Sequence, residues 1–267
     1  MKKIILQFSL LLATTVILFS CKKADLGTEA PDAIGANITA MVTAAGFDAT
    51  DLKRTNGGYL IEGDIFMTES DLKKMGNNNG PELIIANEEH YRTTNLVNGI
   101  RTITVSLNTT QPNFVAGTNE AIRRYNALNL GLTFQLVSGT SADINIVTFY
   151  QVSNTLGSAG FPAGGNPYNT VNMNTYWYTP TVAVNPLATT IAHEMGHCIG
   201  FRHTDYMNRA YSCGGRKSNE GTAGVGAVYI PGTPTGGSAA SWMLACGGTS
   251  TDRPFTSADV TALTTLY

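Results

Sequence analysis

Three of the four histidines in this 267-residue chain fall in one short stretch, His193-Glu194-Met195-Gly196-His197-Cys198-Ile199-Gly200-Phe201-Arg202-His203. Asn185-Pro186 favours a helix start before this stretch, because asparagine can cap a helix and proline is tolerated at the first helical position. The sequence therefore predicts a helix over Leu187–Cys198, which Gly200 ends in a left-handed conformation. A turn at Gly200 can swing His203 back toward the helix.

The spacing of these histidines predicts a catalytic zinc site. His193 and His197 are four residues apart, so they share one face of the helix. Together with His203 they offer three imidazole nitrogens and leave one coordination position open, whereas a structural site would be closed by a fourth protein ligand. Glu194 is displaced enough to reach water bound to the ion instead of the ion itself, which makes it the candidate general base. We expect one catalytic Zn²⁺ ion and metal-assisted hydrolysis of peptide bonds.

At residues 193–203 the chain resembles the metzincin metallopeptidases, and Thr204-Asp205 after the third histidine looks most like the dual-action HEIGH metallopeptidases. Met195 stands where the family's name implies isoleucine. The resemblance implies a zinc endopeptidase of α+β fold, with a twisted, mostly parallel sheet, an antiparallel edge strand, an active-site helix and a C-terminal helix. It also implies a methionine turn beneath the zinc. Ser241-Trp242-Met243 is the candidate, with Met243 under the histidines; an ordinary core methionine is the alternative.

The resemblance extends over the second part of the chain. Ser141–Ile146 is similar to the sheet strand of matrixins, and Phe255–Tyr267 is similar to their closing helix. We therefore expect a catalytic domain over residues 99–267. Metzincins hold an extended peptide as an added strand at a sheet edge, and the resemblance makes Thr170–Thr175 that edge. Ala245 stands where astacins place a zinc-binding tyrosine, so no tyrosine ligand is expected.

Local patterns predict the other elements of this domain. Alternation favours strands at Arg101–Leu107, Leu132–Val137 and Ala142–Phe149. Thr118 is a plausible cap for a helix between the first two strands, and the Gly/Pro-rich stretch Gly157–Pro167 is expected to be a loop. The fourth histidine, His90, lies in a polar stretch and is expected to be a solvated surface residue.

Residues 37–98 form a small segment before this domain. In it, Leu60-Ile61-Glu62-Gly63-Asp64-Ile65 looks like the aspartate-switch segment of astacin propeptides. That likeness implies that Asp64 supplies a carboxylate to the open zinc position and keeps the enzyme inactive. The alternative is a strand turn with an exposed aspartate.

The amino terminus has the layout of a secretory signal peptide, with Lys2 and Lys3 before the apolar run Ile4–Phe19. Leu18-Phe19-Ser20-Cys21 resembles the lipobox of bacterial lipoproteins. We expect a signal peptide over residues 1–20, an acylated Cys21 and a tether over 21–36. The protein would then be extracytoplasmic and anchored by lipid to the bacterial outer membrane or cell surface. A plain signal peptide is the alternative.

Export to an oxidising compartment permits disulfides. With Cys21 acylated, three cysteines remain, and at most one bridge can form between them. Cys213 and Cys246 both lie in loop-like sequence, whereas Cys198 lies on the predicted helix, so we favour a Cys213–Cys246 disulfide. Three free thiols are the alternative.

The amino-acid composition and the net charge indicate which kinds of binding partner to expect. Lysine and arginine number 17 against 19 aspartates and glutamates, the formal net charge is −2, and no basic cluster exceeds a short pair. Nucleic acid is therefore not an expected partner. We expect an extended peptide or protein substrate, a membrane reached through the lipid anchor, and a monomer. The competing class is an extracytoplasmic binding or adhesion lipoprotein with a non-catalytic zinc site. Glu194 discriminates between the two, because a structural site has no use for a base.

Overall fold

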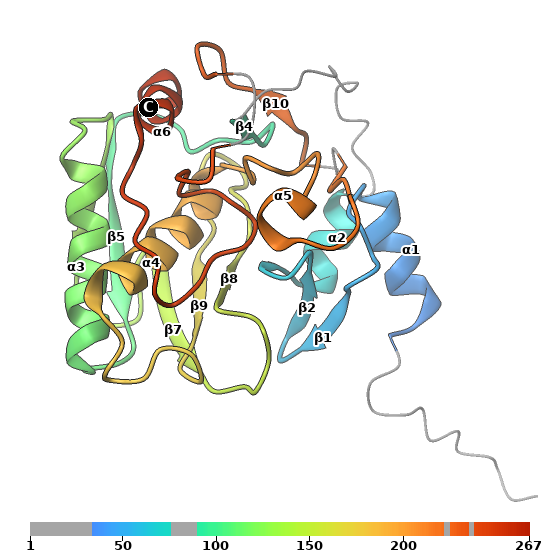
Figure 1. Cartoon of the computed structure of the whole chain (residues 1–267), viewed down its shortest axis with the longest axis horizontal. Coiled ribbons are helices and arrows are strands. Elements are labelled where there is room, and N and C mark those ends of the chain that lie inside the picture. The colour runs from blue at the N-terminus through green and yellow to red at the C-terminus, as the bar shows by residue number, and fades with distance from the viewer. Residues whose placement is uncertain (1–33, 76–89, 222–224, 235–237) are drawn as a thin grey trace, which may run out of the picture. The chain divides into compact units, whose positions relative to one another are not determined.

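The computed structural model describes residues 34–75, 90–221, 225–234 and 238–267. The predicted signal peptide, Cys21 and nearly all of the predicted tether lie outside these ranges. Along the chain the elements are α1 (Ala36–Ala44), β1 (Lys53–Thr55), β2 (Gly58–Ile61), β3 (Ile65–Met67), α2 (Glu69–Met75), β4 (Tyr91–Arg92), β5 (Arg101–Leu107), α3 (Pro112–Asn126), β6 (Leu132–Leu136), β7 (Ile144–Phe149), β8 (Gly157–Ala159), β9 (Thr170–Asn174), α4 (Val184–Ile199), α5 (Ala210–Cys213), β10 (Val228–Tyr229) and α6 (Ser257–Leu266) (Figure 1).

One large sheet organises the described residues, with the strand order β1-β2-β3-β8-β9-β7-β5-β6. The strands β6, β5, β7 and β9 run parallel to one another. β8 is antiparallel to β9, and β3 pairs in parallel with β8 through Ile65 and Ala159. β1, β2 and β3 then continue as an antiparallel meander. The predicted α+β class, a mostly parallel sheet with antiparallel strands, is confirmed.

The strand predicted to be the substrate-binding edge lies inside the sheet. β9 pairs with β7 on one side and with β8 on the other. The edge prediction at Thr170–Thr175 is wrong because Gly157-Ser158-Ala159, expected to be loop, forms β8. Its three residues are all small, so they show no alternation of apolar and polar side chains. A strand that is held by main-chain hydrogen bonds does not require such an alternation. On the side that faces β3, β8 is therefore the outermost strand contributed by the region 99–267.

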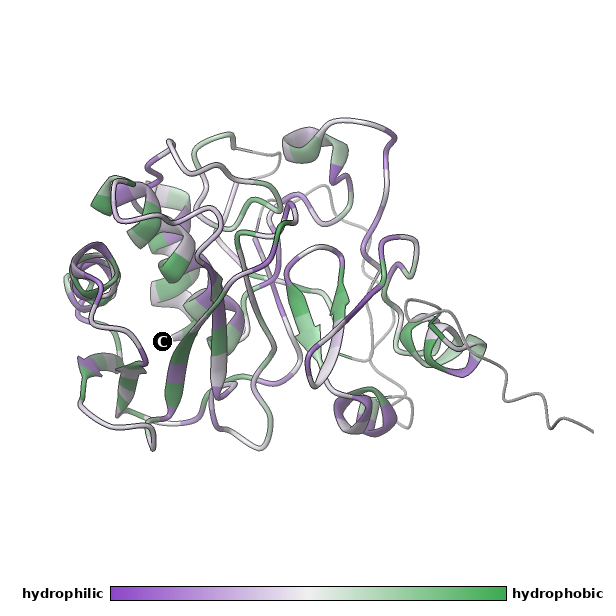
Figure 2. Ribbon diagram, turned by 90° about the horizontal axis from the view of Figure 1, so that it is seen from below, coloured by the Kyte–Doolittle hydropathy of each residue, from purple (hydrophilic) through white to green (hydrophobic). Residues whose placement is uncertain are grey.

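Helices α3 and α4 pack against each other and against this sheet. Between the two helices and the sheet lies the larger hydrophobic core. Its fully buried members include Ile103, Val105, Tyr125, Ile144, Ile146, Leu187 and Ile191. Figure 2 shows hydrophobic residues concentrated on the strands and helices. α3 begins at Pro112 and not after Thr118, so the predicted cap at Thr118 is wrong. Thr118 is fully buried inside the helix, where packing against α4 overrides the local capping signal.

The first segment has a small core of its own. Val42 of α1, Ile61 of β2, Ile65 of β3 and Leu72 of α2 are all nearly inaccessible to solvent. Phe161 and Val225, which come from the later part of the chain, complete this cluster. The segment thus relies on the larger region to bury its apolar side chains.

Residues 90–98 are hydrogen-bonded to the region after residue 99. β4 pairs with β10, and Thr93 N–H donates to Gly200 O at 2.8 Å. His90 is 1% exposed and its Nε2 lies 2.6 Å from Asp259 Oδ1 on α6. The expectation that His90 is a solvated surface residue is therefore wrong, because its Nε2 pairs with a buried carboxylate that is distant in sequence.

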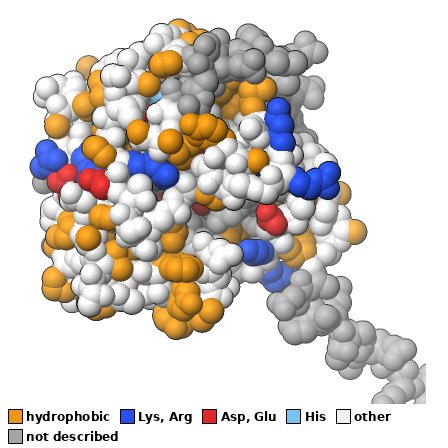
Figure 3. All heavy atoms as spheres, viewed as in Figure 1, with side chains coloured by type: hydrophobic (Ala, Val, Ile, Leu, Met, Phe, Trp, Pro, Cys, Tyr) orange, Lys and Arg blue, Asp and Glu red, His pale blue; other side chains and the backbone are white. Residues whose placement is uncertain are grey.

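The surface charge and the helices of the protein are described for residues 34–75, 90–221, 225–234 and 238–267. Basic side chains lie singly or in small groups on the face shown in Figure 3, and those at its left edge adjoin acidic side chains. Within the described ranges, no helix is both long and apolar enough to cross a bilayer.

Cys213 and Cys246 form a disulfide, as the sequence favoured, and Cys198 is a buried free thiol.

Candidate metal centre and cleft

Helix α4 carries two of the three clustered histidines. It begins at Val184, with Ala183 at the cap and no side-chain capping bond, so the expected cap at Asn185 is not used. It ends at Gly200, where φ is 111°. A Cβ atom at this position would lie 3.0 Å from Asn95 O. Glycine is therefore required both for the left-handed turn and for the close approach of residues 93–96. This turn brings His203 back toward α4.

The three imidazoles meet through their Nε2 atoms. His197 Nε2 lies 3.1 Å from His193 Nε2 and 3.2 Å from His203 Nε2. Each ring is oriented by its other nitrogen: His193 Nδ1 donates to Trp242 O at 2.8 Å, and His197 Nδ1 donates to Phe201 O at 2.9 Å. Carbonyl oxygens only accept, so the Nε2 atoms of His193 and His197 carry their lone pairs toward the shared centre.

Asp64 reaches the same centre from the turn between β2 and β3. Its Oδ2 lies 2.9 Å from His203 Nε2 and 3.5 Å from His193 Nε2. The ligand atoms of these two histidines, His197 and Asp64 all lie within 4.8 Å of one another. The main chain holds Asp64 there, because Ala159 N–H of β8 donates to Asp64 O at 2.9 Å. Asp64 is 8% exposed, which rules out the alternative of an exposed aspartate in a turn.

This donor set fits a divalent zinc-like ion. Three neutral imidazoles and a carboxylate are the ligands zinc prefers, and nitrogen lone pairs at about 3.1 Å from each other repel without a cation between them. Asp64 Oδ1 is also buried without a hydrogen-bond partner. The residues present are therefore suited to hold a metal.

The charge environment keeps the histidine at the centre of the cluster neutral and the nearby glutamate basic. Burial, followed by the neighbouring His193 and His203, lowers the pKa of His197 well below its usual range. Burial, followed by the Asp64 carboxylate, raises the pKa of Glu194. A low histidine pKa preserves a metal ligand, and a high glutamate pKa is what a proton acceptor near neutral pH requires.

The turn Ser241-Trp242-Met243 lies against the histidine helix. Trp242 O orients His193, and Met243 O accepts from Thr204 N–H at 2.9 Å, next to His203. Met243 is fully buried, and a Cβ atom at Gly196 would lie 2.7 Å from its Sδ. The structure thus packs Met243 directly beneath the helix turn between His193 and His197, as the resemblance implied.

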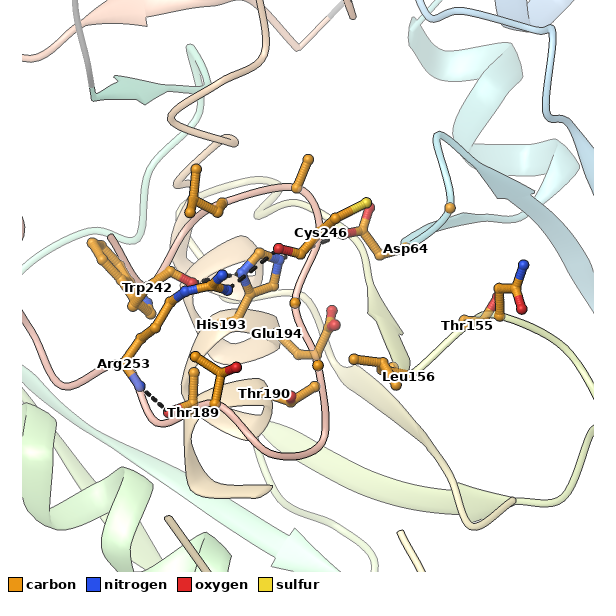
Figure 4. Close-up of a pocket in the computed structure, with 18 of the residues that line it drawn as sticks. Asp64, Thr155, Leu156, Thr189, Thr190, His193, Glu194, Trp242, Cys246 and Arg253 are labelled. Carbon is orange, nitrogen blue, oxygen red and sulfur yellow. Dashed lines mark hydrogen bonds and ion pairs between the residues drawn. The ribbon is translucent and has the colours of Figure 1, made fainter. Parts of the chain in front are cut away.

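A cleft with a volume of about 310 Å³ opens beside the histidines. Figure 4 shows His193 and Glu194 at its base, with Trp242 and Arg253 on one side and Thr155 and Leu156 on the other. Glu194 Oε2 is buried with no hydrogen-bond partner. A Cβ atom at Gly157 would lie 2.9 Å from Glu194 Oε1, so the missing side chain on β8 leaves the carboxylate its space.

A buried charge cluster behind His203 was not predicted from any sequence pattern. Glu220 Oε1 accepts from His203 Nδ1 at 2.6 Å and from Arg209 Nη1 at 2.8 Å. Arg202 Nη2 lies 3.4 Å from Glu220 Oε2 and 3.9 Å from Glu62 Oε2. Glu220 lies in glycine-rich, loop-like sequence, where no local pattern distinguishes a buried partner of a metal ligand.

The sequence model of the dual-action HEIGH metallo-peptidase family matches residues 59–267. Among curated proteins, none matches. Two solved structures of myroilysin match with 16% and 18% identity and TM-scores of 0.35 and 0.32. The matched regions cover 42% and 48% of this chain, and they span only about half of the myroilysin chains, 54% and 53%.

Proposed function

The chain belongs to the dual-action HEIGH metallo-peptidase family, and we propose that it is a zinc-dependent endopeptidase in which His193, His197 and His203 hold the ion. The observation that carries this proposal is the convergence of three Nε2 atoms whose rings are fixed by Trp242, Phe201 and Glu220. When bound, zinc supplies Lewis-acid polarisation of the scissile carbonyl and of the attacking water.

Glu194 is the proposed general base. It follows His193 on α4, lines the cleft and has a free buried oxygen. Its raised pKa suits it to accept a proton from the attacking water and to deliver that proton to the leaving amine. Gly157 has no side chain, and this leaves the carboxylate room to move between the attacking water and the leaving amine.

The proposed substrate is an extended peptide that pairs with β8. This strand borders the cleft through Gly157 and is the outermost strand of the region 99–267 on the side that faces β3. Peptides bound to a sheet edge gain affinity from main-chain hydrogen bonds. In this structure the edge is taken by β3, since Ile65 pairs with Ala159.

We also propose that residues 37–75 hold the enzyme inactive. Asp64 makes the fourth member of the ligand cluster, and four protein ligands are the mark of a closed zinc site. The same segment covers β8, so it blocks both the metal position and the substrate edge. A permanently structural zinc site has the same ligand count, but it does not explain an unpartnered buried Glu194 beside an open cleft.

The proposal also includes export and acylation of Cys21, which would place this peptidase on a bacterial membrane as a monomer. The lipobox-like residues Leu18–Cys21 support it.

Metal removal tests the proposed reaction. The full-length protein, after activation by limited proteolysis, should contain about one zinc per chain and cleave a denatured protein substrate. A chelator should abolish cleavage, and added Zn²⁺ should restore it. Cleavage that persists in chelated protein shown to be metal-free contradicts the proposal.

Asp64→Ala tests the inhibitory role. Losing the carboxylate removes a charge-assisted contact with the histidine cluster, so we expect the uncut full-length protein to cleave peptides roughly ten- to hundredfold faster. The control is Asp51→Ala, because Asp51 lines the same cleft from the same segment but is exposed. Intact mass must show that the segment is still attached. Equal activity in wild type and Asp64→Ala would exclude an inhibitory carboxylate.

A further inference from the structure

Arg253 lines the proposed catalytic cleft together with His193 and Glu194. It lies in the stretch between the methionine turn and α6. Figure 4 shows its side chain running along the cleft wall toward Cys246, on the same side as Trp242. Its guanidinium is therefore available to a substrate residue next to the bond that is cut.

The guanidinium has unused hydrogen-bonding capacity. Its Nη1 donates to Cys246 O at 3.3 Å, and its Nε is buried with no partner. Three other buried or half-buried arginines pair with carboxylates: Arg124 with Asp252, and Arg202 and Arg209 with Glu220. No described carboxylate forms such an ion pair with Arg253. A buried N–H without an acceptor is costly, which favours a ligand that supplies one.

The carboxylate that acts electrostatically on Arg253 already accepts hydrogen bonds from other groups. Asp205 is the carboxylate whose charge acts on Arg253. However, Asp205 Oδ1 accepts from Ala245 N–H at 2.9 Å, and its Oδ2 accepts from the Ser212 hydroxyl at 2.6 Å. Burial lowers the pKa of Arg253, as expected for a cation without a close counterion.

The wall that carries Arg253 is fixed at both ends. The disulfide to Cys213 anchors Cys246. At the other end, Arg253 N–H donates to Thr189 Oγ1 at 2.9 Å, and Thr189 Oγ1 donates to Asp252 Oδ1 at 3.0 Å. The backbone at Arg253 is thus held to α4, and the bond from Nη1 to Cys246 O holds the guanidinium against the cleft wall.

We infer that Arg253 is a specificity-determining residue that binds an acidic side chain of the substrate immediately beside the scissile bond. This inference rests on the proposed peptidase function. A planar guanidinium binds a carboxylate through two parallel hydrogen bonds, and the half-buried wall strengthens them. The substrate class is thus extended peptides with aspartate or glutamate at that position. Lys53 also lines the cleft, but it is exposed and belongs to the segment proposed to be inhibitory.

The test is cleavage of paired peptides that differ only by Asp against Asn, or Glu against Gln, at each position flanking the cut. Full-length protein activated by limited proteolysis is used throughout. Wild type should prefer the acidic member at one position by about ten- to hundredfold in kcat/KM. Arg253→Gln should bring this ratio close to one while still cleaving the neutral peptide, and Arg253→Glu should favour lysine there. Arg123→Gln, on an exposed part of α3, is the matched control and should retain the preference.

Unchanged melting temperature and zinc content in Arg253→Gln establish that the variant is folded and loaded. Cleavage by wild type with no acidic preference, or a preference that survives Arg253→Gln, overturns the role of Arg253 and leaves the peptidase function standing. No metal-dependent cleavage of any peptide overturns both.

Discussion

Glu194→Gln is expected to lower kcat/KM for peptide hydrolysis by on the order of 10²–10⁴-fold, the range for loss of a positioned general base. Glutamine has nearly the same volume, so the helix turn between His193 and His197 should stay intact. It cannot accept a proton, whereas the carboxylate with its raised pKa can. The measurement is steady-state cleavage of a peptide by activated full-length protein, with zinc content determined on the same sample.

Zinc content distinguishes a catalytic role from a structural one. We expect Glu194→Gln to keep its zinc, since Glu194 is not part of the four-residue ligand cluster. Glu120→Gln, a half-buried glutamate on α3 that is not part of the ligand cluster, is the control and should keep both activity and zinc. Full activity in Glu194→Gln would remove the proposed mechanism, and the binding or adhesion class would then become the better reading.

The local part of the site could be predicted from the sequence for a simple physical reason. His193, Glu194 and His197 lie on one helix, where residue spacing fixes which side chains share a face. Gly200 then determines how the chain turns, and only two residues separate it from His203. Short-range geometry of this kind is independent of the rest of the fold.

The long-range part of the site could not be predicted in this way. Glu220 meets His203, and His90 meets Asp259, through contacts that only the tertiary structure creates. β8 was not predicted, because its small residues show no alternation of apolar and polar side chains. Asp64 is the informative exception: a resemblance suggested its role, and the structure places it at the histidines through a strand pairing that no periodicity shows.

Glu220→Ala is expected to weaken zinc binding by roughly ten- to hundredfold and to destabilise the fold. A partner that accepts from the free nitrogen of a metal-binding histidine holds the ring in place and raises its basicity, and its loss typically costs that much affinity. His203 would lose its 2.6 Å contact, and Arg209 would lose its ion pair. Breaking a buried charge pair costs about 3–5 kcal/mol of unfolding free energy.

Two variants separate these effects. Glu220→Gln keeps an oxygen that can accept from His203 Nδ1 but removes the charge, so it should retain more of the zinc affinity than alanine does. Glu69→Ala breaks an exposed ion pair with Lys73 on α2 and should cost less than about 1 kcal/mol. Unfolding should be measured on zinc-loaded and chelated protein, and zinc affinity by competition with a chelator. If Glu220→Ala binds zinc as tightly as wild type, His203 is oriented by the backbone turn at Gly200 alone and the buried charge cluster serves only stability.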